Sequence, residues 1–337
     1  MLLSLFSGCG GLDLGFEQVG FRSGLAYDLR PSAIASWNLN RPDFAIGRVQ
    51  DIFSLNLATM DEHFGSEFTP NGVIGGPPCQ SFSIANSQRT PHDPRTRLVN
   101  KFFSLSLDLH HRKPLDFVVM ENVPGLATRR HRHILDYQIR RLRKAGFLVS
   151  KHILDAAHYG VPQRRKRLIV VAYNPAASMG SSWDRPKATS ELPVTVREAI
   201  GVLSEPTQFK RGLDPASFPE HPNHWCMVPK SEKFFDGSLN QGGSFGRSFK
   251  TLMWDEPSYT VSYGHREVHV HPNGKRRLSV FEAMKLQGFP KEFVLSGNLS
   301  QQITQVSEAV PPPLGKAIAE RIADDLSYPS CSRASAA

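Results

Sequence analysis

Cys79 stands in an unusual local setting, directly after two glycines and two prolines. The glycines allow a sharp turn that another molecule can approach closely, and the prolines fix the backbone that presents the thiol. A free thiol ionises near pH ~8.5, and its thiolate is a strong nucleophile. A cysteine beside a turn is more often a small buried apolar residue. The stiff run 75–78 nevertheless favours a nucleophile, provided that a base or a charged partner lies nearby.

Three acidic residues stand at the ends of short apolar runs that are typical of strands: Asp28, Asp51 and Glu121. Open α/β sheets carry their chemistry at the carboxyl ends of strands, so Glu121 and Cys79 can share one rim. Each carboxylate could instead cap a helix or a turn. The basic run 159–167 lies between two further strands and contains Arg165 and Arg167. It is either a plain basic loop or a source of guanidinium groups for the same rim.

A glycine-rich turn follows the first apolar run and opens a helix, with Ser7, Gly8, Gly10 and Gly11 in it. Its spacing departs from G-x-G-x-x-G, so it is a weak signal for nucleotide binding when taken alone. Asp28 strengthens the signal, because an acid about twenty residues later, at the end of the next strand, typically binds ribose hydroxyls. Together these residues favour a nucleotide-like cofactor.

The elements that position these residues alternate between strands and helices, which predicts an α/β fold. Strands are expected at 2–6, 24–28, 72–74, 116–120, 148–155 and 167–172, and helices at 98–109, 128–145 and 314–326. A further helix begins at Ser279, with Glu282 in the capping-box position, and ends near 287. The seven basic residues of the helix 128–145 are more often a solvated face than a contact to DNA.

The composition is that of an ordinary soluble protein with a surplus of basic residues. The 337 residues include 40 Lys and Arg against 31 Asp and Glu, which gives a net charge of +9 and favours a polyanionic partner. Four cysteines without C-x-x-C spacing argue against a disulfide framework and a zinc site. No apolar run reaches the ~18 residues of a membrane span, and Met1 begins no secretory leader, so we expect a cytoplasmic protein without a membrane partner.

A change of composition near residue 174 predicts two domains. Residues 1–175 would form the catalytic and cofactor-binding domain, completed by a C-terminal helix at 305–327, and residues 176–304 a smaller second domain rich in Pro, Ser and Gly. Residues 328–337 are expected to be a disordered tail. His269 and His271 alternate onto one face of a strand-like segment, but no third ligand accompanies them, so no metal site is predicted.

Five segments resemble, in order, the motifs of the cytosine-5 DNA methyltransferases: Phe6-Ser7-Gly8-x-Gly10-Gly11, Pro77-Pro78-Cys79-Gln80-Ser81-Phe82-Ser83, Glu121-Asn122-Val123-Pro124, Gln163-x-Arg165-x-Arg167 and Arg277-Leu278-x-x-x-Glu282. The resemblance runs from about residue 3 to 322, and the short chain is similar to a stand-alone bacterial restriction-modification enzyme. It implies a Rossmann-like domain with a mostly parallel sheet, S-adenosylmethionine as cofactor, and a target-recognition domain at 176–304.

The resemblance also implies the chemistry. Cys79 would attack carbon 6 of a cytosine flipped out of the duplex, and carbon 5 would then take the methyl group. Glu121 would hydrogen-bond the ring nitrogen and the amino group of the base, while Arg165 and Arg167 would hold its carbonyl and orient the loop.

The remaining site residues are carried over by the same resemblance. Phe6 would contact adenine, Asp28 the ribose hydroxyls and Asp51 the adenine edge. The predicted cofactor-binding residues are Phe6, Ser7, Gly8, Gly10, Gly11, Asp28, Asp51, Ile52, Pro78, Leu98, Ala309 and Val310. The predicted DNA-binding residues are Gln80, Ser81, Ser83, Arg95, Ser244, Arg247, Thr260, His265 and Arg266. Double-stranded DNA is the expected partner, a cognate restriction endonuclease is a further candidate, and a monomer is the default.

Two departures from the family pattern bear on the cofactor. Leu29 stands where Trp is common, and Ser307-Glu308 replaces the usual Gly-Asn. The resemblance places Glu308 near the methionine end of the cofactor, where its carboxylate could attract the cofactor's amino group or repel its carboxylate.

Three alternatives to this function stay open. An RNA-directed methyltransferase is disfavoured by the residues after Cys79, an idle DNA-binding homologue by the intact catalytic set, and a nicotinamide oxidoreductase by the lack of a role for Cys79.

Overall fold

The computed structural model describes residues 1–44, 46–78, 96–189, 191–245, 249–260 and 268–328. Within these ranges, no helix is both long enough and apolar enough to span a bilayer.

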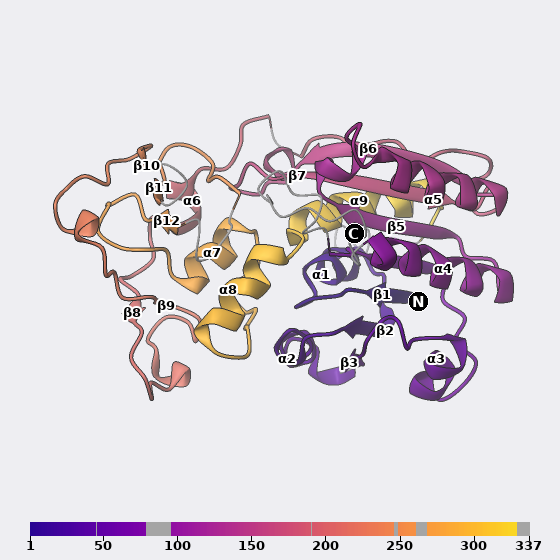
Figure 1. Ribbon diagram of the computed structural model, residues 1–337, viewed down its shortest axis with the longest axis horizontal. Coiled ribbons are helices and arrows are strands. Elements are labelled where there is room, and N and C mark those ends of the chain that lie inside the picture. The colour runs from indigo at the N-terminus through magenta and orange to yellow at the C-terminus, as the bar shows by residue number, and fades with distance from the viewer. Residues whose placement is uncertain (45, 79–95, 190, 246–248, 261–267, 329–337) are drawn as a thin grey trace, which may run out of the picture.

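A seven-stranded sheet with the order β3-β2-β1-β4-β5-β7-β6 forms the centre of the fold (Figure 1). β3, β2, β1, β4 and β5 run parallel, and β7 is antiparallel to both of its neighbours. The predicted α/β fold with a mostly parallel sheet is therefore confirmed. The strands are β1 (Leu2–Leu5), β2 (Ser23–Asp28), β3 (Gly47–Val49), β4 (Gly72–Gly75), β5 (Phe117–Asn122), β6 (Leu148–Asp155) and β7 (Lys166–Tyr173).

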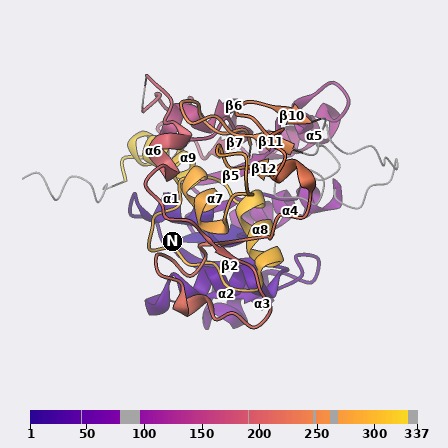
Figure 2. The ribbon, with the colours of Figure 1, turned by 90° about the vertical axis from the view of Figure 1, so that its left-hand side faces the viewer.

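Helices cover both faces of the sheet, so its central strands are apolar on both sides (Figures 1 and 2). Val73 and Val118 belong to one core, whereas their neighbours Ile74 and Val119 belong to the other. The first core is covered by α3 (Leu57–Phe64), α4 (Thr96–Arg112) and α5 (Arg132–Lys144), and the second by α1 (Gly11–Glu17) and α9 (Pro312–Asp325).

The first helix, α1, and the last helix, α9, lie in close contact. A Cβ atom at Gly15 would come within 2.4 Å of the backbone nitrogen of Lys316, so glycine is required at this crossing. The C-terminal helix packs on the seven-stranded sheet, which is why residues more than 300 positions after β1 contribute to the same cavity.

A second region of shorter elements lies beside the carboxyl ends of the parallel strands (Figure 1). Its apolar core contains Trp225, Leu252 and Phe281, and it also takes in Cys9 from the glycine-rich turn. Trp183, beyond the predicted boundary at 175, still packs in the core of the sheet. A separate recognition domain thus stays a prediction. The elements are α6 (Val196–Ile200), β8 (Thr207–Gln208), β9 (Trp225–Cys226), β10 (Ser244–Phe245), β11 (Phe249–Thr251), β12 (Val268–Val270), α7 (Val280–Leu286) and α8 (Leu299–Glu308).

The remaining helices are short or lie at the edge of the sheet. α2 (Pro31–Leu39) packs beside β3, and single turns of 3-10 helix occur at Pro42–Phe44, Pro124–Ala127, Ala156–Tyr159, Pro215–Ser217 and Glu232–Phe234. The predicted capping box of α7 is confirmed, since Ser279 accepts from the Glu282 backbone and Glu282 accepts from the Ser279 backbone.

The C-terminal helix expected at 314–326 is found as α9, but the wider bounds 305–327 span parts of two helices. Residues up to Glu308 belong to α8, and α9 begins only at Pro312, because Pro311 cannot donate the backbone hydrogen bond that would continue a helix. Tyr328, the first residue of the predicted tail, instead packs against the core of the sheet. The Tyr328 ring packs edge-on against Phe21, and its hydroxyl donates to Asp116, while residues 329–337 lie outside the described ranges.

Candidate functional site

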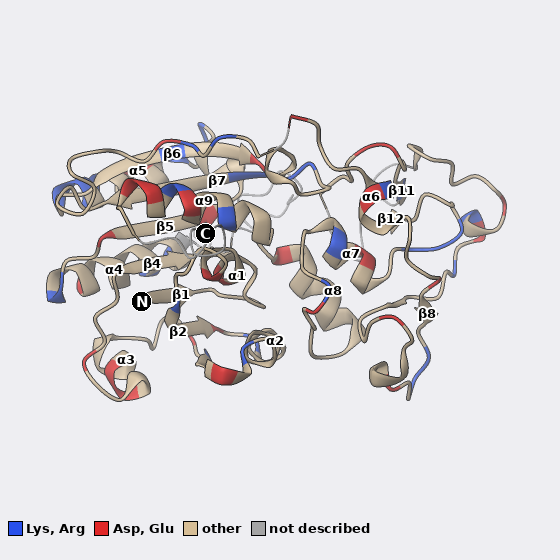
Figure 3. Cartoon of the chain, turned by 180° about the vertical axis from the view of Figure 1, so that it is seen from behind, with Lys and Arg blue, Asp and Glu red and all other residues tan. Residues whose placement is uncertain are grey.

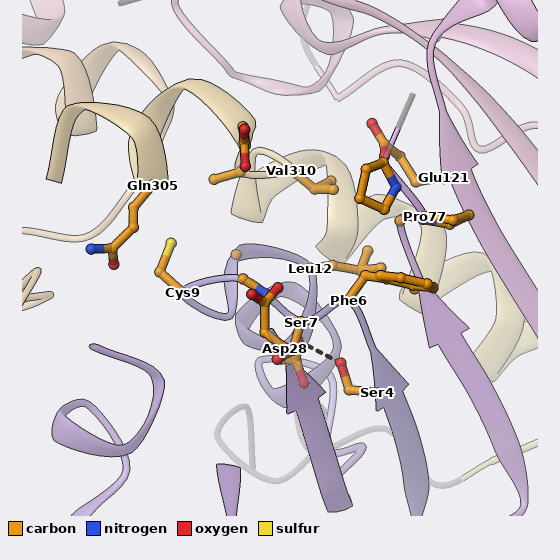
Figure 4. A pocket seen from close by; sticks show the side chains of 18 of the residues that line it. Ser4, Phe6, Ser7, Cys9, Leu12, Asp28, Pro77, Glu121, Gln305 and Val310 are labelled. Atoms are coloured by element: carbon orange, nitrogen blue, oxygen red, sulfur yellow. Dashed lines mark hydrogen bonds between the residues drawn. The ribbon is translucent and has the colours of Figure 1, made fainter. Parts of the chain in front are cut away.

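A cavity of about 190 Å³ opens at the carboxyl ends of β1, β2, β4 and β5, against the segment between α8 and α9 (Figure 4). Asp28 lies toward one end of it and Glu121 toward the other. Most of the predicted cofactor and catalytic residues of the described chain line this cavity together: Phe6, Ser7, Gly8, Asp28, Gly11, Pro78, Glu121, Arg165, Arg167, Ala309 and Val310.

The turn after β1 is shaped by left-handed backbone angles at Phe6 (φ 55°), Gly8 (φ 56°) and Gly10 (φ 90°). Phe6 is the strained member, since residues with a side chain rarely adopt positive φ. The Gly8 N–H donates to Oδ2 of Asp28 over 2.9 Å, which joins the turn to the end of β2. The turn and the acid that the sequence linked by spacing are therefore in direct contact.

Two glycines of this turn allow close packing beneath the cavity. A Cβ at Gly10 would come within 2.7 Å of the guanidinium of Arg41, which donates to the Gly10 carbonyl and lies 4.2 Å from the Trp37 ring centroid. A Cβ at Gly11 would come within 2.4 Å of the carbonyl oxygen of Val310. Glycine at position 11 thus lets the C-terminal segment form a wall of the cavity.

Glu121 ends the apolar part of β5 and pairs with Arg167 at the start of β7. Arg167 Nε lies 2.7 Å from Glu121 Oε1, and the two side chains are 13% and 12% exposed. The antiparallel pairing of β5 with β7 places both residues on the rim. A Cβ at Gly76 would come within 3.0 Å of Glu121 Oε2, so the small residue before the two prolines leaves room for this carboxylate.

Asn122 anchors the segment that leads to Cys79. Its Nδ2 donates to the Pro77 carbonyl over 3.1 Å, and its Oδ1 accepts from the Val123 N–H over 3.0 Å. Analysis of the sequence missed this role, although the position directly after Glu121 in a four-residue motif was the available signal. The anchor fixes Pro77, two residues before the predicted nucleophile.

Cys79 itself lies outside the described residues, together with seven predicted DNA-binding residues: Gln80, Ser81, Ser83, Arg95, Arg247, His265 and Arg266. The ionisation of two other cysteines, Cys9 and Cys226, follows from their burial. Burial raises the pKa of Cys9 to about 12 and that of Cys226 to about 11, so both remain thiols at neutral pH. Cys9 lines the cavity but is therefore a poor nucleophile.

Arg165 has a different set of contacts from Arg167. Its side chain is almost wholly buried, and its Nη2 donates to the carbonyls of Ser307 (2.9 Å) and Ala309 (3.0 Å). Gln287 donates to the same Ala309 carbonyl and accepts from Gln163. In the Gln-x-Arg-x-Arg motif, Gln163 and Arg165 thus hold the C-terminal wall, while Arg167 holds Glu121. A contact of Arg165 with the base stays a prediction.

Four predicted cofactor residues do not line this cavity: Gly10, Asp51, Ile52 and Leu98. Asp51 is exposed and accepts from the Phe53 N–H over 2.9 Å, which is the turn-capping alternative. Ile52 and Leu98 pack against the core under α4. Of the described DNA-binding candidates, Thr260 donates to the Arg164 carbonyl over 2.9 Å, and Ser244 lies in β10. Contacts of Ser244 and Thr260 with DNA stay predictions.

The last motif contains Glu282, which is buried. Arg276, the residue directly before this motif, makes a two-pronged ion pair with Glu282, at 2.9 and 2.8 Å. This pair holds the start of α7 and lies away from the cavity.

Comparisons with known proteins show the family to which the chain is similar. The chain matches the family described as C-5 cytosine-specific DNA methylase over residues 1–324. It is 32% identical over 352 aligned residues to the type II methyltransferase M.MthTI of Methanothermobacter thermautotrophicus, with 96% of this chain and 97% of that protein covered. It is 30% identical to the type II methyltransferase M.NmeDI of Neisseria meningitidis serogroup C, with 95% and 82% covered.

Among solved structures, a prophage-encoded protein of E. coli described as a DNA modification methyltransferase has the same fold. The TM-score is 0.80 at 22% identity, and the match covers 97% of this chain and 99% of that one.

Proposed function

The chain belongs to the family of C-5 cytosine-specific DNA methylases, and we propose that it methylates a flipped-out cytosine in one specific sequence of double-stranded DNA through a covalent adduct with Cys79. The chain is a DNA cytosine-5 methyltransferase of the type found in type II restriction-modification systems. The family and the fold imply S-adenosylmethionine as methyl donor.

The observation that carries the proposal is the shared cavity. One wall is the glycine turn with Asp28, and the other is the Glu121–Arg167 pair beside Pro77 and Pro78. A cofactor held by the first wall and a base held by the second would face each other across a short distance. The predicted nucleophile directly follows the second wall in the chain.

The residues of the first wall suit S-adenosylmethionine. Asp28 is a carboxylate whose two oxygens are already oriented by the backbone N–H groups of Gly8 and Arg30, and Phe6 offers an aromatic face beside it. Such a carboxylate is suited to accept from ribose hydroxyls. When bound here, the cofactor supplies an electrophilic methyl group. We further assign Ser7, Gly11, Pro78, Ala309 and Val310 to its binding.

The residues of the second wall act on the cytosine. The thiolate of Cys79 adds to carbon 6, and the electron pair of the 5,6 double bond moves to carbon 5. Carbon 5 would form its new bond to the methyl carbon of the bound cofactor as the bond between that carbon and the sulfonium sulfur breaks, with the bonding electrons left on the sulfur. Glu121, held by Arg167, hydrogen-bonds the ring nitrogen and the amino group, where charge changes during the addition. Loss of the proton on carbon 5 to a base then restores the double bond and expels the thiolate.

The base must leave the helical stack to reach this rim. We assign the region 176–304 to target recognition and the predicted residues Ser244, Thr260, His265 and Arg266 to contacts with DNA. Figure 3 shows the basic start of β7 on the side of the sheet that faces this region. Phosphate contacts of this kind weaken steeply as salt increases. A cognate endonuclease cutting the same sequence would explain the need for the modification.

The test is bisulfite sequencing of a DNA library incubated with the protein and S-adenosylmethionine, with Cys79→Ala as the control. We expect protected cytosines to cluster in one short sequence and to disappear with the variant. Protection that persists in Cys79→Ala would refute the adduct. Protection found only when an RNA library replaces DNA would refute the substrate, and binding of DNA without any protection would point to an idle homologue.

A further inference from the structure

An ion pair between Arg30 and Glu308 lies at the rim of the cavity. Arg30 precedes α2, Glu308 ends α8, and Nη1 of the arginine donates to Oε2 of the glutamate across 278 residues of sequence. Arg30 Nε also lies 3.4 Å from Oδ1 of Asp28. All three residues line the cavity. Glu308, which departs from the family pattern, is therefore paired with a cationic side chain.

The pair is placed by the packing around it and does not itself hold the helices together. Ser36 of α2 donates to Gln305 of α8 over 2.6 Å in a buried position, and it accepts from the half-buried Ser296 N–H over 2.7 Å. The side chains of Arg30 and Glu308 are 37% and 44% exposed. Ion pairs as exposed as this contribute little to stability and can separate at low cost.

The charges around the pair are distributed unevenly. Asp28 and Glu308 are two carboxylates at the same rim, and Arg30 is the cation that contacts both. Arg167 is engaged with Glu121, and Nη2 of Arg165 binds two backbone carbonyls deeper in the cavity. Removing the charge of Arg30 would leave this rim strongly negative, which disfavours an anionic group of a ligand.

We propose that Arg30 and Glu308 together recognise the amino-acid end of S-adenosylmethionine, an inference that rests on the cofactor of the proposed function. The pair separates, the Arg30 guanidinium binds the α-carboxylate, and the Glu308 carboxylate binds the α-ammonium group. One internal pair is replaced by two charge-assisted pairs with no change in net charge. A zwitterionic ligand end fits this rim, and an end with a single charge or none does not.

The test measures by calorimetry how tightly three nucleosides bind to the full chain in the absence of DNA. The three are S-adenosylmethionine, decarboxylated S-adenosylmethionine and methylthioadenosine. Arg30→Gln should weaken S-adenosylmethionine about tenfold or more, because a charge-assisted hydrogen bond is lost, and should leave the decarboxylated ligand within about twofold. Glu308→Gln should weaken both ligands that carry the ammonium group. Neither variant should change methylthioadenosine, which lacks the amino-acid end.

Arg197→Gln is the matched control, since it breaks the exposed pair of Arg197 with Asp255 outside the cavity and removes the same charge. Equal weakening of all three nucleosides by Arg30→Gln would show that the pair only shapes the cavity, and unchanged binding in both variants would also refute the inference. A loss of affinity confined to the ligands that carry the affected amino-acid group would support the inference. Failure of the unaltered protein to bind any of the three would overturn the proposed cofactor itself, and this inference with it.

Discussion

Arg167 Nε lies 2.7 Å from Glu121 Oε1 in an ion pair, with both side chains nearly buried at the rim of the sheet. The contact is possible because β7 runs antiparallel to β5 and places its first residues opposite the last residues of β5. Arg167 therefore orients the carboxylate that the proposed mechanism aims at the cytosine. Arg165, two residues earlier, is directed instead to the C-terminal wall.

Replacing Arg167 with Met should lower both stability and activity. An unpaired carboxylate would remain in a nearly buried position, and breaking such a pair costs about 3 kcal/mol. Methyl transfer should fall about a hundredfold, because an electrostatic group beside the reacting base is misplaced. Urea unfolding and incorporation of labelled methyl groups measure the two effects. The double variant Glu121→Gln with Arg167→Met should recover stability without activity, and recovery of both would contradict the assigned role.

Replacing Asn122 with Ala should lower the turnover number about fivefold, because the bond to the Pro77 carbonyl that steadies the segment before Cys79 is worth about 1 kcal/mol. The affinity for S-adenosylmethionine should stay within about twofold. Asn56→Ala is the control, since Asn56 caps the distant helix α3 and should affect stability alone. Steady-state kinetics and calorimetry separate the cases, and a change in affinity without a change in turnover would contradict the prediction.

Replacing Arg276 with Met should destabilise the protein by about 3 kcal/mol, whereas Arg277→Met should cost far less. Arg276 holds the buried Glu282 by two hydrogen bonds, so its loss leaves a buried charge without its main partner. The free energy of unfolding in urea checks the difference. Equal losses for the two variants would mean that the pairing does not decide the stability of this segment.

Stability should decrease as the pH falls from about 6.5 to about 4. Burial lowers the pKa of His221 to about 4, and burial with some repulsion from Lys250 lowers that of His269 to about 4 as well. The unfolded chain binds protons over this interval that the folded imidazoles do not, so protonation favours unfolding. Each histidine contributes a slope of at most about 1.4 kcal/mol per pH unit.

Urea unfolding at pH 7, 5.5 and 4.5 measures this slope. His221→Asn should flatten it, and His111→Asn, at an exposed position, should leave it unchanged. A slope that is the same in the unaltered protein and in His221→Asn would contradict the assignment.

Much of the fold could be predicted because its signals are local. The apolar runs at the strands, the stop at Gly146 after α5 and the capping box of Ser279 depend on neighbours within a few residues. The helix expected at 314–326 is confirmed as α9, whereas the wider bounds 305–327 were wrong for a local reason too, since Pro311 separates α8 from α9. Asp51 illustrates the limit of position alone, because the end of a strand suits a ligand carboxylate and a turn cap equally well.

The sequence by itself predicted the catalytic set and its order, since the glycine turn, the run before Cys79, Glu121 and the two arginines are short motifs whose residue types favour one chemistry. Only the tertiary structure decided which charge meets which. Glu121 pairs with Arg167, Glu308 with Arg30 and Glu282 with Arg276. These pairings depend on the antiparallel β7, the packing of α2 on α8 and the direction of one of two adjacent side chains. Such contacts arise from how distant elements pack, and no local spacing encodes them.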